Sequence, residues 1–125
     1  MILFRNTQNI KLMSNTFSVY INGNKVLDYE RPSRHTGIER RFLDEMELDL
    51  DEGIHLNGEL IESPDKMQRA SYVAMSLLYG IETENNDMVS IACAYLANRM
   101  TDLKQIRAVE EGQDVTLDFI FYEIN

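Results

Sequence analysis

The sequence is poor in several residue types, and each shortage excludes a class of protein. Its 125 residues include one cysteine, two prolines and no tryptophan. The single cysteine, Cys93, cannot form a disulfide within the chain, which fits a reducing compartment. No run approaches the ~20 apolar residues of a membrane-spanning helix, and Arg5 breaks the opening run MILF before it reaches the ~7–15 residues of a signal peptide. We therefore expect a soluble cytoplasmic protein that has no membrane contact.

Basic residues are also scarce. Twelve Lys and Arg stand against 21 Asp and Glu, which gives a net charge of −9. This balance argues against a general nucleic-acid binder, which needs a positively charged footprint. The 44% of hydrophobic residues and 26% of charged residues are typical of a folded globular protein. The length suits a single domain over 1–125, in which residues 1–12 form a poorly ordered extension if Met13 is the true start.

Alternating apolar residues predict strands near both ends of the chain. Residues 16–29 read as a hairpin around Asn22-Gly23-Asn24. Residues 115–122 form a strand, and residues 103–109 are either a strand or the tail of a helix. Residues 54–62 are either a short hairpin around Asn57-Gly58 or an extended loop.

Three segments between these strands have helical spacing. A capping box from Thr36 to Glu39 begins a helix over about 37–51, although the alternation at 46–51 also fits a strand. A helix over 64–79 begins at a capping Ser63 with Pro64 in its first position, and Gly80 ends it. The next helix runs from Met88 to about Met100, and its apolar middle predicts a buried position.

Strands at both ends with helices grouped between them predict the α+β class. We expect a small antiparallel sheet, built from the N-terminal hairpin and the C-terminal strands, that packs against a helical hairpin and one further helix. Helical spacing also places methionines in the core; these are Met46, Met67, Met75, Met88 and Met100. The six tyrosines are scattered and form no stacking ladder.

Motifs for catalysis and cofactor binding are missing. The chain has no G-x-S-x-G elbow and no glycine-rich phosphate loop, so we expect no nucleotide or other cofactor. Cys93 lies in mid-helix between alanines, which indicates a structural role. A metal site would have to use Asp49, Asp51 and His55, with His35 as a further ligand. On a helix, however, Asp49 and Asp51 point about 200° apart.

The net charge is unevenly distributed. Residues 1–41 carry +4, residues 42–65 hold nine acids and no Lys or Arg, and residues 66–125 carry −4. Within the middle block, six acids form a candidate surface for a protein partner with a basic surface: Asp44, Glu45, Glu47, Asp49, Asp51 and Glu52. Four arginines just before it are candidate anion ligands: Arg31, Arg34, Arg40 and Arg41. The simplest alternative is a solvated surface with no binding role.

We therefore predict a non-enzymatic module that binds another macromolecule through the acidic residues 44–52. The first alternative is a divalent-metal protein or enzyme built on Asp49, Asp51 and His55. The second alternative is a structural homo-oligomer, such as a homodimer, that pairs through Ile120 and Tyr122 on the second face of the last strand.

Overall fold

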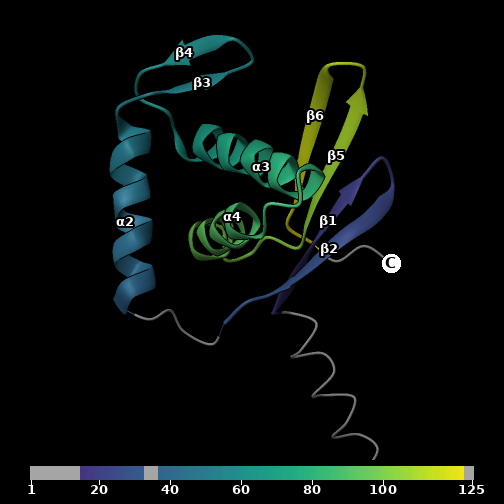
Figure 1. Ribbon diagram of the computed structural model, residues 1–125, viewed down its shortest axis with the longest axis horizontal. Coiled ribbons are helices and arrows are strands. Elements are labelled where there is room, and N and C mark those ends of the chain that lie inside the picture. The colour runs from purple at the N-terminus through teal and green to yellow at the C-terminus, as the bar shows by residue number, and fades with distance from the viewer. Residues whose placement is uncertain (1–14, 33–36, 123–125) are drawn as a thin grey trace, which may run out of the picture. The chain divides into compact units, whose positions relative to one another are not determined.

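The structure, a computed structural model of the chain, describes residues 15–32 and 37–122. Within these residues it has three helices, a four-stranded sheet and a two-stranded sheet, which confirms the α+β class (Figure 1). The elements are, in chain order, β1 (Thr16–Ile21), β2 (Asn24–Glu30), α2 (Gly37–Asp51), β3 (Ile54–Leu56), β4 (Glu59–Ile61), α3 (Lys66–Glu82), α4 (Asn86–Arg99), β5 (Gln105–Glu111) and β6 (Asp114–Ile120). The proposed extension over residues 1–12 and the alternative start at Met13 lie outside the described residues.

The chain groups into two compact units. Unit 1 comprises the residues up to Arg31 and those from Met100 onward, and it contains the four-stranded sheet. Unit 2 comprises residues 32–99, and it contains the three helices of the described chain together with the β3–β4 hairpin. The single domain over residues 1–125 stays a prediction.

The sheet of unit 1 has the strand order β2-β1-β5-β6. The pair β1–β2 is the predicted antiparallel hairpin, β5–β6 is a second antiparallel hairpin, and the central pair β1–β5 is parallel. The sheet is therefore mixed, and the expectation of a purely antiparallel sheet is corrected at this pair. Parallel pairing of β1 with β5 is possible because the long connection through unit 2 separates them. Parallel neighbours need a crossover of a dozen or more residues.

Two of the hairpins turn on an asparagine–glycine pair. Asn22 and Gly23 have φ values of 50° and 84°, and Asn57 and Gly58 have 53° and 79°. Two successive positive φ angles fit the type I′ turn, whose twist matches that of the flanking strands. The structure thus confirms the hairpin over 16–29 and selects the hairpin, rather than the loop, for 54–62.

One face of the four-stranded sheet holds the buried residues of its two central strands. Phe17, Val19, Ile106 and Ala108 are almost inaccessible to solvent. Val19 lies beside Ile106 in the parallel pair, so these side chains form one row across the sheet. Residues 103–109 therefore belong to a strand and its approach, not to a helix tail.

In unit 2, α3 and α4 form the predicted helical hairpin, but both ends of α3 differ from the prediction (Figure 1). Asp65, rather than Ser63, caps the helix: its carboxylate accepts from the Gln68 amide at 2.8 Å, and the Gln68 side chain accepts from the Asp65 amide at 2.9 Å. This reciprocal pair satisfies two backbone amides, whereas a serine cap acting alone would satisfy one.

Gly80 does not end α3, which continues to Glu82. A Cβ atom on Gly80 would lie 3.1 Å from a methyl group of Val89 and 3.2 Å from Cγ of Met88. The glycine therefore permits the close approach of α4, and the helix accepts the lower propensity of glycine there.

The helix α2 spans Gly37–Asp51, as predicted, which excludes a strand over 46–51. The capping residue proposed for it, Thr36, lies outside the described residues. In residues 15–32 and 37–122, no helix combines the length and the apolar character needed to cross a bilayer.

Candidate functional site

The six acids predicted as a docking surface lie on two different sides of α2 and its end. Asp44, Glu47 and Asp51 follow one another at steps of three and four residues, so they share one side of the helix. Glu45, Asp49 and Glu52 repeat the same spacing one or two positions later. Because each residue turns the helix by about 100°, the second set points away from the first.

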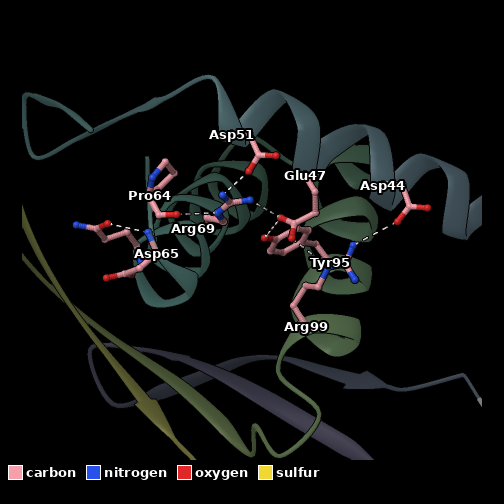
Figure 2. Close-up of polar contacts among 9 residues, drawn as sticks. Asp44, Glu47, Asp51, Pro64, Asp65, Arg69, Tyr95 and Arg99 are labelled. Carbon is pink, nitrogen blue, oxygen red and sulfur yellow. Dashed lines mark hydrogen bonds and ion pairs between the residues drawn. The ribbon is translucent and has the colours of Figure 1, made fainter. Parts of the chain in front are cut away.

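Glu47 is the centre of a polar cluster on the inner side of α2 (Figure 2). Its Oε1 accepts a hydrogen bond of 2.5 Å from the Tyr95 hydroxyl on α4. The same oxygen lies 3.4 Å from Nη1 of Arg69 on α3, and Oε2 lies 3.5 Å from Nε of Arg99. One carboxylate thus joins all three helices of unit 2.

The other two inner acids complete this cluster. Asp51 forms an ion pair with Arg69, whose Nε also donates to the Pro64 carbonyl at 3.0 Å. Asp44 lies 3.6 Å from Nη2 of Arg99. The hydrogen bond from Arg69 to Asp51 is the main reason that the pKa of Arg69 is raised. Three of the six predicted docking acids are therefore used to hold α2 in place.

The Tyr95 hydroxyl in this cluster is held in its neutral form. The residue is 2% exposed, and burial, together with the hydrogen bond to the negative Glu47, raises its pKa. The neutral phenol serves here as a hydrogen-bond donor to Glu47, so its role is to hold α4 to α2.

The outer side of α2 has a different composition. The side chains of Glu45, Asp49 and Glu52 are exposed and form no hydrogen bond or ion pair with the described residues. Three large apolar side chains are also exposed on this helix: Ile38 (80%), Phe42 (46%) and Leu48 (65%). We call these six residues the α2 outer face.

The four-residue spacing of Ile38, Phe42, Met46 and Leu50 predicts one apolar stripe along α2. A four-residue repeat advances about 40° beyond a full turn at each step. The stripe therefore drifts around the helix, and only its C-terminal part, with Leu50, is buried.

The proposed metal ligands are not brought together. Asp51 is paired with Arg69, Asp49 lies on the outer side of α2, and His55 is on β3. His35 lies outside the described residues. In the part of the chain that the structure describes, no group of three or more His, Cys, Asp or Glu side chains is arranged to hold a metal ion.

The four arginines predicted as anion ligands do not form a described cluster. Arg34 lies outside the described residues, Arg40 and Arg41 are exposed on α2, and Arg31 belongs to unit 1. The Arg31 guanidinium donates from Nη2 to the carbonyls of Met100 and Leu103, at 3.1 and 2.8 Å, and lies over the ring of Phe17. Arg31 therefore braces unit 1 internally, and its role as an anion ligand stays a prediction.

We expect the change Arg31→Ala to lower the free energy of unfolding by about 2 kcal/mol, because two carbonyls lose a charged donor. Arg31→Lys should restore only part of this loss, since an ammonium group cannot reproduce the planar contact with the ring of Phe17. Urea denaturation followed by circular dichroism measures both. The exposed Arg41→Ala is the matched control, and an equal loss in the control would contradict the proposed brace.

A second feature of unit 2 was missed by sequence reasoning. An open hollow of about 300 Å³ is bounded by α3, the start of α4 and the β3–β4 hairpin. We call it the Met/Tyr hollow; it is lined by His55, Leu56, Asn57, Tyr72, Met75, Ser76, Tyr79 and Met88. The prediction that Met75 and Met67 lie in the core is wrong, because both are exposed by more than a third. The signal available in the sequence was the spacing of Tyr72, Met75 and Tyr79 along one helical face.

Two further predictions concern single residues. Cys93 is 1% exposed, and burial raises its pKa to about 12, which confirms a buried structural thiol. Ile120 ends β6, an edge strand of the sheet, and Tyr122 follows it and is exposed. Pairing of two copies through these residues stays a prediction.

Comparisons of this chain with protein-family models, with curated proteins and with solved structures gave no match.

Proposed function

We propose that unit 2 is a non-enzymatic protein-binding module whose α2 outer face docks a partner segment rich in Lys or Arg and apolar side chains. One observation supports this function above all: exposed acids whose side chains lack partners among the described residues lie among large exposed apolar residues on one side of α2 and its C-terminal end. The inner acids already have structural partners, so the outer acids are the ones free to bind.

The charge of unit 2 supports a basic partner. Residues 32–99 contain six Lys and Arg and 13 Asp and Glu, so they carry −7 of the total charge of −9. A field of this sign raises the association rate of a basic partner and repels nucleic acids and anionic membranes. The exposed apolar side chains would provide the contact area, since burial of a Leu or Ile side chain contributes roughly 1.5–3 kcal/mol.

The proposal predicts that the outer acids control affinity. The probe is a fluorescein-labelled amphipathic peptide of lysine and leucine, titrated with the full chain and followed by fluorescence anisotropy. We expect the combined change Glu45→Gln, Asp49→Asn and Glu52→Gln to weaken binding about tenfold, because three exposed charge pairs contribute roughly 0.2–1 kcal/mol each. Binding to the unchanged chain should also weaken as salt is raised.

A matched control removes the same amount of charge elsewhere. The variant combining Glu111→Gln, Asp114→Asn and Asp118→Asn changes three exposed acids of the β5–β6 hairpin in unit 1. If both triple variants weaken binding equally, net charge alone acts and the α2 outer face is not the docking site. The location in the cytoplasm stays a prediction in this proposal.

A further inference from the structure

The Met/Tyr hollow of unit 2 is a built concavity rather than a gap between loops. Tyr72, Met75 and Tyr79 lie along one face of α3 at steps of three and four residues, and Tyr79 is 60% exposed. His55 and Leu56 of β3 also line it. The residues that line the hollow lie on a helix, the start of a second helix and a hairpin with a tight turn.

Met88 is held at this hollow by two local interactions. Its backbone amide donates to the Asn85 side chain at 3.1 Å, which caps the first turn of α4. The absence of a side chain at Gly80 lets Met88 lie against α3, because a Cβ there would be 3.2 Å from Cγ of Met88. The position of this methionine is therefore determined by the helix hairpin itself.

The chemistry of the lining favours apolar side chains of a protein partner. Methionine thioethers adapt their shape to different apolar groups, and tyrosines provide rigid contact area at low entropic cost. A hollow of about 300 Å³ accommodates a few side chains, not a whole secondary-structure element. The occupant should thus insert side chains from a segment that lies across the opening.

The acids beside the hollow indicate the charge of that segment. Glu59 pairs with Leu56 across the β3–β4 hairpin, Glu82 follows Tyr79 by one turn of α3, and Asp87 precedes Met88. No Lys or Arg is among the residues that line the hollow in the described chain. A segment that inserts apolar side chains here is therefore complemented by Lys or Arg on either side of them.

We propose that the Met/Tyr hollow is the anchor site for the apolar side chains of a basic amphipathic helix. This inference rests on the proposed function, because it assigns the same partner class a second point of contact in unit 2. An amphipathic helix presents apolar residues at i, i+3, i+4 and i+7 on one face and keeps its basic residues at the margins, which is the arrangement that the hollow and its acids match.

The test uses the full chain and two peptides of equal charge. One is the lysine–leucine amphipathic peptide, and the other has serine in place of each leucine. The combined change Met75→Ser and Tyr79→Ser alters two residues of the hollow that are more than a third exposed, and should lower the urea midpoint only slightly. Tyr122→Ser, at a tyrosine in unit 1 that is 65% exposed, is the control.

We expect the hollow variant to bind the leucine peptide about tenfold more weakly, as for an interface anchor of moderate strength, and Tyr122→Ser to bind it unchanged. The serine peptide should bind the hollow variant and the unchanged chain equally. If the hollow variant retains full affinity while the triple variant of the α2 outer face loses it, the anchor site is wrong and the proposed function stands. If only the hollow variant loses affinity, the anchor site stands and the α2 outer face is wrong.

Discussion

Glu47→Ala should lower the free energy of unfolding by about 3 kcal/mol, the largest effect that we expect from a single substitution on α2. The change removes the acceptor of the buried Tyr95 hydroxyl and leaves Arg69 and Arg99 with fewer counter-charges. A buried donor that loses its acceptor retains its full desolvation penalty, which is why the loss exceeds that of an ordinary surface ion pair.

Chemical denaturation of the variant and two companions measures this effect. Glu47→Gln keeps an acceptor for the Tyr95 hydroxyl but loses the charge, so we expect a loss of about 1–2 kcal/mol. Asp49→Asn, two residues along on the outer side of the same helix, should change stability by less than about 0.5 kcal/mol. Equal losses for Glu47→Ala and Asp49→Asn would show that the polar cluster does not hold α2.

The second large effect is a loss of stability at alkaline pH. Burial raises the pKa of the Cys93 thiol from 9.0 to about 12, and burial with the Glu47 hydrogen bond raises the pKa of Tyr95 above its ordinary 10.0. Both groups are neutral at pH 7 in the folded and the unfolded chain, so their full contribution is present below pH 9. Above that, the unfolded chain releases protons first, and stability falls as pH rises toward the folded pKa values.

Each group contributes a slope of up to ~1.4 kcal/mol per pH unit, so we expect a loss of about 3–4 kcal/mol between pH 9 and pH 11. Urea denaturation at half-unit intervals of pH measures the slope. Cys93→Ala should remove the part of the stability loss that begins near pH 9. Tyr95→Phe should remove the part that begins near pH 10. The slopes are compared rather than the absolute stabilities, since each substitution also changes packing. An unchanged slope in both variants would mean that neither group titrates with unfolding.

The features that were predictable from the sequence are the ones that nearby residues determine. The Asn22-Gly23 and Asn57-Gly58 turns follow from the backbone freedom of two adjacent residues. The parallel pairing of Val19 with Ile106 joins positions far apart in the chain, and no local pattern encodes it. The end of α3 was misjudged at Gly80 for the same reason, because the contact that favours glycine there comes from α4.

The candidate site was predictable only in composition. The acidic run was plain in the sequence, and helical phase alone divides it into two sets. Which set is structural depends on Arg69 and Arg99, which lie on other helices. The Met/Tyr hollow is not predictable from the sequence, because the spacing of Met75 is equally compatible with a buried face. The packing of neighbouring elements decides whether this side chain is exposed.

The Arg31 brace has a consequence for the order of folding. It holds together the points at which the chain leaves unit 1 and returns to it, since Arg31 contacts the carbonyl of Met100. During synthesis β1 and β2 emerge first, yet β1 has no parallel neighbour until β5 follows. If residues 32–99 fold before β5 and β6 emerge, fewer flexible residues separate β1 from β5. The entropy cost of closing the sheet is then lower.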